Sequence, residues 1–165
     1  MACSWLPPFP RFVFTIFEPI SLVAGCVPGI VAPDWFIGQQ MAQHTPVPSS
    51  KNSQLVAQQL GNAFGLLAMV GAAVLYTTSE PKVVRNYLVA LWIADIGHVY
   101  LTCRGLGSDR FMDVASWNAM TWGNVFVTLL LCLTRTAYLL GWFGPDRPVV
   151  GGSYSAAKPK AMKSL

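Results

Sequence analysis

The stretch ALWIADIGHVYLTC, residues 90–103, is almost entirely apolar, yet it carries Asp95 and His98 three positions apart. Residues three apart are neighbours on a helix surface, so a helix through this segment presents both side chains on one face. An acid or an imidazole in apolar surroundings is costly unless it has a partner or a task. The fold and the function of the chain therefore both depend on where this segment lies.

The composition around that stretch is typical of a membrane protein. Of the 165 residues, 53% are hydrophobic and only 11% are charged, and the mean hydropathy is +0.46. A bilayer core of roughly 30 Å is crossed by about 20 mostly apolar helical residues. Windows of this kind fall near 12–32, 55–77, 83–103 and 121–143. The sequence therefore predicts an all-α, polytopic membrane protein, an antiparallel bundle of four transmembrane helices.

The connections divide the chain into a membrane domain, residues 1–144, and a tail, residues 145–165. Residues 33–54 are polar and hold three prolines, which predicts a loop outside the bilayer. Residues 77–86 form a short link, with Ser79 as the expected N-cap and Pro81 in the first turn of the third helix. Residues 104–124 predict a loop with a short interfacial helix. The tail has no apolar period and predicts a disordered basic segment.

The basic residues predict the orientation of four spans. Seven lie on the side of the N-terminus, the 77–86 link and the tail, and three lie on the other side. The first set is Arg11, Lys82, Arg85, Arg147, Lys158, Lys160 and Lys163; the second is Lys51, Arg104 and Arg110. The positive-inside rule then predicts that both termini lie in the cytosol. We expect this integral membrane protein to lie in the endoplasmic reticulum. Because these residues flank spans without interleaved aromatics, we expect no nucleic acid partner.

One acid and one arginine lie at matching expected depths in the first and fourth windows. A rise of 1.5 Å per residue places Glu18 roughly 10 Å and Arg135 about 12 Å from the cytosolic edge. An unpaired charge at such a depth costs about 3 kcal/mol or more, which predicts a structural ion pair between the two. Pro19 frees a helix carbonyl beside this pair, and a neighbouring helix must satisfy that carbonyl.

The same arithmetic places Asp95 about 20 Å from the cytosolic edge, nearer the lumenal side, with His98 beyond it. Asn62 of the second window and the segment WNAMTWGN, residues 117–124, reach a similar level. We expect a polar cluster there, in which Asn62, Asn124 and the indole of Trp122 surround the acid and the imidazole.

Three functions fit such a cluster. It can be a hydrogen-bond network that fixes helix packing, since Gly61, Gly65, Gly71, Gly97 and Gly123 allow close approach. It can catalyse acid–base chemistry on a lipophilic substrate, because a desolvated carboxyl can keep its proton and an imidazole can return one. It can also be a proton or solute path, which four helices could enclose only as an oligomer.

Several patterns are absent from the sequence, and they narrow the chemistry. There is no DDxxD-like aspartate cluster for magnesium and diphosphate, no GxSxG, CxxC, GxGxxG or P-loop, and no histidine array for iron. Cys3, Cys26, Cys103 and Cys132 have no metal-ligand spacing, and His44 lies in a polar loop. We therefore expect no metal and no cofactor, with membrane lipid and a lipophilic small molecule as the partners.

Four segments in order, FEPISLVAG, QLGNAFGLLA, LWIADIGHVY and WNAMTWGNVFVTLLLCLTRTAYLLG, resemble a family of small fungal integral membrane proteins known only as a domain of unknown function. The resemblance covers about residues 11–143 and implies a fungal source and four spans. Its pattern falls on Glu18, Pro19, Asn62, Asp95, Gly97, His98, Trp117, Asn118, Trp122, Gly123, Asn124 and Arg135.

The design is also similar, without a shared motif, to emopamil-binding-protein-like sterol isomerases and to the membrane-bound meroterpenoid cyclases of fungal biosynthetic pathways. This likeness implies a substrate class, an isoprenoid or other lipophilic metabolite, and a cyclase or isomerase reaction. Asp95 and His98 are the expected catalytic pair, with Glu18 as the reserve acid. Trp117, Asn118, Trp122, Asn62 and Asn124 are the expected substrate contacts. The alternative is a non-catalytic membrane scaffold or lipid-binding protein, in which the cluster only fixes packing.

Overall fold

The computed structural model describes residues 5–41 and 49–146, and within these ranges the chain is all-α. One continuous helix comprises α1 (Pro8–Phe12), the π-helical turn η1 (Val13–Phe17) and α2 (Glu18–Val31). The next elements are α3 (Pro33–Gln40), α4 (Lys51–Thr77), α5 (Pro81–Leu106), α6 (Ser108–Met112) and the 3-10 turn η2 (Val114–Ser116). A last composite helix comprises α7 (Ala119–Thr121), the π-helical turn η3 (Trp122–Val127) and α8 (Thr128–Leu139).

Three of these helices are long and apolar enough to cross a membrane: Pro8–Val31, Lys51–Thr77 and Ala119–Leu139. Their outward faces carry large exposed apolar side chains, among them Ile20, Met69 and Leu133, each more than 60% exposed. Such faces are favourable in lipid and unfavourable in water. The four predicted windows coincide with the long helices to within about four residues at each end. A fourth span is not shown, since α5, which carries Asp95 and His98, is not among the three.

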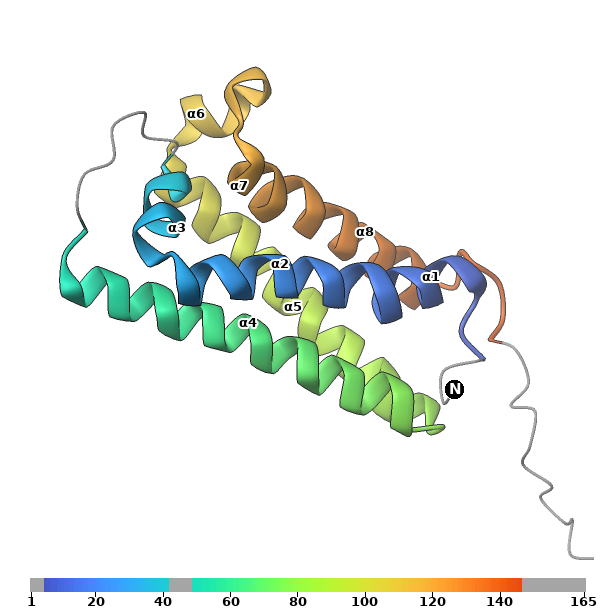
Figure 1. The fold of residues 1–165 in the computed structure, drawn as a ribbon. Coiled ribbons are helices and arrows are strands. Elements are labelled where there is room, and N and C mark those ends of the chain that lie inside the picture. Colours follow the sequence, from blue (N-terminus) through green and yellow to red (C-terminus); the bar gives the residue numbers. More distant parts are fainter. Residues whose placement is uncertain (1–4, 42–48, 147–165) are drawn as a thin grey trace, which may run out of the picture.

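The long helices form two antiparallel pairs (Figure 1). α2 packs along α4, and α5 packs along α8. The first pair is held close by glycines, because the Cα of Gly61 lies 3.0 Å from the position that a Cβ on Gly29 would occupy. The second is joined by a hydrogen bond of 2.9 Å from the indole nitrogen of Trp92 to the hydroxyl of Thr136. The two pairs meet at the end of the molecule where α1 lies beside the end of α8.

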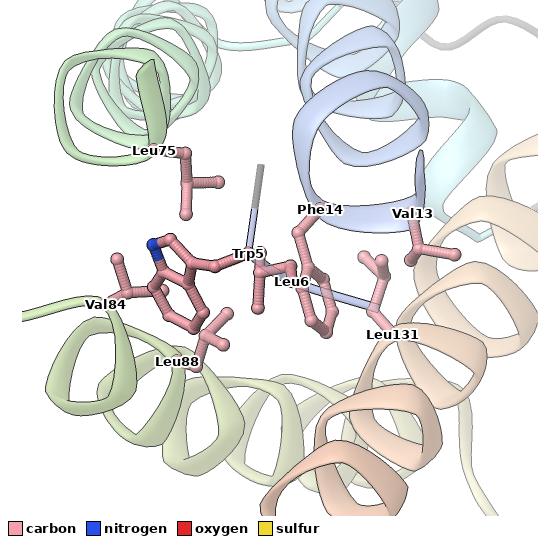
Figure 2. Close-up of a cluster of buried hydrophobic side chains, with 8 residues drawn as sticks. All are labelled: Trp5, Leu6, Val13, Phe14, Leu75, Val84, Leu88 and Leu131. Carbon is pink, nitrogen blue, oxygen red and sulfur yellow. The ribbon is translucent and has the colours of Figure 1, made fainter. Parts of the chain in front are cut away.

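A buried apolar cluster fills that end of the molecule (Figure 2). Trp5 lies between Leu75, near the end of α4, and Val84 and Leu88, in the first turns of α5. Phe14 closes the cluster toward the middle of the bundle, and its ring meets that of Tyr138 edge-on at 6.3 Å. This cluster fixes the level at which the helices of the two pairs face one another.

The helix carbonyl freed by Pro19 has a partner on another helix. Proline lacks an N–H, so the carbonyl of Thr15, four residues earlier, loses its helical donor. The hydroxyl of Tyr76 on α4 donates to this carbonyl at 2.7 Å. A π-helical turn, η1, lies directly before Glu18.

Two of the predicted connections need correction. Residues 33–54 are not all loop, because Pro33–Gln40 form α3, with proline at the start and Asp34 in the first turn. Ser79 is not the N-cap of α5; Glu80 holds that position and Pro81 begins the helix. The short helix expected within 104–124 is present as α6, after α5 ends at Gly107 with φ +80°. Cys3, His44 and the tail from residue 147 lie outside the described residues.

The space around two glycines predicts different effects of a glycine-to-alanine substitution on stability. A Cβ on Gly61 would lie 2.9 Å from the carbonyl oxygen of Cys26, whereas a Cβ on Gly97 meets nothing within 4 Å. Overpacking against backbone costs about 1–3 kcal/mol, so we expect Gly61→Ala to lower the melting temperature of the purified protein in detergent. Gly97→Ala should leave it unchanged or raise it slightly. Equal melting temperatures for the two variants would contradict this packing.

Candidate functional site

A cavity of about 450 Å³ lies between the two helix pairs. Every long helix contributes to its walls, which are mainly apolar; Leu22, Phe64, Leu91 and Leu131 are among them. Trp35 and Phe36 of α3 line it as well, so α3 does more than connect two spans. The volume is within the usual range for small-molecule sites, roughly 300–1,000 Å³.

Three charged side chains from three helices meet at this cavity. Arg135 of α8 is fully buried and donates from Nη2 to Oε1 of Glu18 and from Nη1 to Oδ2 of Asp95. The ring of Phe14 lies 5.5 Å from the guanidinium carbon. Glu18 and Asp95 both line the cavity. The ion pair expected between Glu18 and Arg135 is present, and Asp95 extends it to a triad.

The triad corrects the expectation that Asp95 lies at a different level from Arg135. The expected depths count residues from Arg11, Lys82 and Phe143, as if these three were level. Leu88 and Phe14, however, belong to the same buried apolar cluster. From these two residues, Asp95 is seven positions along α5 and Glu18 is four positions along its helix, a difference of about 4.5 Å. A long arginine side chain reaches both carboxyl groups.

His98 lies one turn beyond Asp95 on the same cavity wall. It interacts with the side chain of Asn124, which comes from the π-helical turn η3 and also lines the cavity. The amide of Asn124 in turn donates to Oε1 of Gln40 at 3.0 Å. The acid and the imidazole therefore face one cavity, as the spacing in ADIGH predicts, with one amide beside them.

Helix α3 is held over the cavity by polar contacts at both of its ends. Gln39 accepts hydrogen bonds from Asn118 on its carbonyl and on its side-chain oxygen, at 2.8 and 3.0 Å. At the other end, Asp34 accepts from Ser49 and Gln54. These hydrogen bonds, the one from Ser49 first, lower the pKa of Asp34 below its ordinary value.

Four of the expected substrate contacts do not line the cavity. Asn62 is exposed, because Gly61 faces α2 and the next residue is turned about 100° away. Trp122 is 41% exposed and meets Trp117 edge-on at 5.2 Å, while Gly123 faces the cavity. Asn118 caps α7, accepting from the Thr121 amide at 2.8 Å. The polar cluster is therefore not closed by Asn62 or Trp122, and only Asn124 of the expected contacts lies in the wall.

The sequence argument missed the contribution of α3, which brings Trp35, Phe36, Gln39 and Gln40 to the site. Pro33 followed by Asp34 is a helix-start signal that could have revealed it. The close approach of several glycines was also overestimated, because a Cβ on Gly97 or Gly123 meets nothing within 4 Å. Among residues 5–41 and 49–146, no group of three or more metal-ligating side chains could hold an ion.

Fold and site together define a helical, multi-pass membrane protein with a mainly apolar cavity between its helices, lined by a few polar and charged side chains. The sequence profile of the family DUF7704, a domain of unknown function, matches residues 3–145, and the chain belongs to this family. No match was found among curated proteins or among solved structures. The expected resemblance to a family known only as a domain of unknown function is thereby confirmed, while the fungal source and the four spans that it implies stay predictions.

The triad predicts a large effect at Arg135. Replacing this arginine with glutamine leaves two carboxyl groups facing each other in an apolar site, a loss of about 3–5 kcal/mol for a broken buried pair. We expect Arg135→Gln to reduce the yield and the melting temperature of the protein in detergent. The exposed Arg85 gives the matched control, and Arg85→Gln should be neutral.

A triple variant tests the electrostatic reason. Glu18→Gln, Asp95→Asn and Arg135→Gln together remove all three charges while keeping amide hydrogen bonds, so they should recover part of the stability that Arg135→Gln loses. A triple variant less stable than the single one would contradict an electrostatic role for the triad.

Proposed function

We propose that this protein is a membrane-embedded enzyme that transfers protons, without a cofactor, on an isoprenoid or other lipophilic metabolite. The observation that carries the proposal is the position of Asp95 and His98 on one wall of a mainly apolar cavity of about 450 Å³. Side chains that only fixed packing would be enclosed by helix contacts, whereas these two line a space that a ligand can fill.

The charges of the triad support the role of Asp95. With both carboxyls ionised, Glu18, Asp95 and Arg135 carry one excess negative charge, which is costly in apolar surroundings; a neutral triad holds one proton. The side chain of Asp95 is 12% exposed, against 7% for Glu18 and 0% for Arg135. In this mechanism Asp95 delivers the proton, because it is the carboxyl of the triad that a substrate in the cavity can reach most easily.

The reaction is an isomerisation or cyclisation that conserves the atoms of the substrate. Asp95 gives its proton to a C=C double bond or an epoxide oxygen, and the resulting cation rearranges or closes a ring. A neighbouring carbon then loses a proton to His98, whose electron pair accepts it. Return of that proton from His98 to Asp95, three residues away on α5, restores the site.

The proposal includes α5 as a fourth span. Its hydropathy is lowered by Asp95 and His98, which face the cavity, while its outward face carries Ile93, Tyr100 and Leu101, each more than 60% exposed. At 26 residues it is about 39 Å long, enough to cross. With four spans, the seven basic residues on one side support a topology with both termini in the cytosol. We propose the endoplasmic reticulum as the membrane.

This topology predicts the result of a protease-protection experiment. Tags at the N- and C-termini should both be digested in sealed microsomes whose cytosolic face is outward, whereas a tag inserted in α6 should be protected. Digestion of only one terminal tag would mean an odd number of spans. The ring contact between Phe9 and Phe143, with centroids 5.6 Å apart, supports termini on one side.

The proton-transfer function predicts a metabolic phenotype. In a deletion strain of the source organism, a lipophilic intermediate should accumulate, and complementation with Asp95→Asn or His98→Ala should leave it accumulated. Loss of a general acid or base lowers a rate about 10²–10⁴-fold. Asn62→Ala, at an exposed position away from the cavity, is the matched control and should restore the wild-type profile. A deletion that leaves the lipophilic metabolites unchanged would contradict the proposed enzymatic function.

A second candidate is a non-catalytic scaffold or lipid-binding protein. It is favoured by Arg135, which is fully buried with both terminal nitrogens engaged, as a residue that fixes packing should be. The protein level and the melting temperature of Asp95→Asn separate the two candidates. An inactive but abundant and stable variant supports catalysis, whereas a variant that fails to assemble supports packing.

A further inference from the structure

Two polar atoms of the triad have no partner among the described residues, Oε2 of Glu18 and Nε of Arg135. Glu18 is 6% exposed, and its Oε1 accepts from Arg135, but its Oε2 is buried without any hydrogen bond. Buried carboxylate oxygens nearly always have a donor, because leaving one unsatisfied costs as much as losing a hydrogen bond. Since Glu18 lines the cavity, a molecule held there can supply the missing donor.

Most nearby donors of the protein are engaged elsewhere, while the Nε of Arg135 has no partner of its own. The hydroxyl of Ser21, one turn along α2, donates to the backbone carbonyl of Glu18 at 2.7 Å. The terminal nitrogens of Arg135 are held by Oε1 of Glu18 and Oδ2 of Asp95, and the amide of Asn124 donates to Gln40. Because Arg135 is fully buried and does not line the cavity, a donor that reaches Oε2 of Glu18 from the cavity comes with the ligand.

We propose that the cavity binds a lipophilic molecule through a hydroxyl group, which donates a hydrogen bond to Oε2 of Glu18. This inference rests on the proposed function, since it names the polar group of the substrate for the same cavity. A neutral donor fits a triad that holds one proton, whereas an ammonium group would fit a triad with an excess negative charge. The apolar skeleton of the ligand lies against Leu22, Phe64 and Leu131.

The position of Trp35 provides a way to measure binding. Its indole lines the cavity and is 53% exposed, so a bromine atom on a bound ligand can quench its fluorescence. The probes are a bromine-terminated dodecanol, its methyl ether and the corresponding primary amine. They share one chain and differ in the group offered to Glu18. The protein is the full chain in lipid nanodiscs, and Trp35→Phe provides the background of the other tryptophans.

Saturable quenching that depends on Trp35 should be at least roughly tenfold tighter for the alcohol than for the ether, because a hydrogen bond to a charged acceptor is lost with the ether. In Glu18→Gln this ratio should fall toward one, since an amide N–H donates equally to an ether or a hydroxyl oxygen. The first comparison uses only the wild-type protein, so it stands even where the variant does not fold.

Other outcomes overturn the inference. Equal binding of alcohol and ether means that Oε2 takes no donor from the ligand. Tighter binding of the amine means that the site selects a cation. The metabolite profile tests the proposed function separately. If the protein prefers the alcohol but the deletion leaves the metabolite profile unchanged, the hydroxyl-binding site is supported and the proposed enzymatic function is contradicted. If alcohol and ether bind equally but the profile depends on Asp95, the enzymatic function is supported and the hydroxyl-binding site is contradicted.

Discussion

The guanidinium of Arg135 is the constraint on which the rest of the structure depends. It is fully buried, and its two terminal nitrogens are held by carboxyl groups from two other helices, Glu18 before the body of α2 and Asp95 in the middle of α5. A buried charge without a partner would cost several kcal/mol. Separating the two helix pairs would leave Glu18 without its partner, so its ion pair with Arg135 favours their association. The triad joins the pair α2 and α4 to the pair α5 and α8 at one level. The apolar cluster around Trp5 and Phe14 covers the triad on the side where α1 lies beside the end of α8.

The cavity follows from this attachment at one level. On the side of the triad where Trp5 and Phe14 lie, the two helix pairs share a packed core. On the opposite side, toward α3, the two pairs have few contacts with each other. The space between them is closed at its far end by α3, which Asn118 and Asn124 hold through Gln39 and Gln40. Both π-helical turns lie at this site, η1 directly before Glu18 and η3 around Asn124. Such turns are rare in helices and are frequent at functional sites, because they re-aim one side chain without ending the helix.

Sequence reasoning predicted the features that depend on local pattern. The apolar windows located the long helices, the i to i+3 spacing placed Asp95 and His98 on one face, and matched charges joined Glu18 to Arg135. It failed where the result depends on how each helix is rotated about its axis and on how the helices are aligned along the bundle. Asn62 follows a glycine that faces α2, and Trp122 precedes a glycine that faces the cavity, so both are turned away. The level of Asp95 depends on how α5 and the first helix meet in the buried cluster that contains Leu88 and Phe14, an arrangement of distant segments that no single-helix depth count contains.

Packing and proton transfer need not compete for the same residues of the triad. Enclosure falls from Arg135, with no exposed side-chain surface, through Glu18 at 7% to Asp95 at 12%. The packing role therefore belongs mainly to Arg135, which does not line the cavity, while Asp95, the more exposed carboxyl of the triad, lies on the same cavity wall as His98. A guanidinium that holds two carboxyls also keeps them apart from each other and fixes the direction of each. In the proposed function, the interaction that holds the helices together thus orients the acid toward the space where a lipophilic molecule lies.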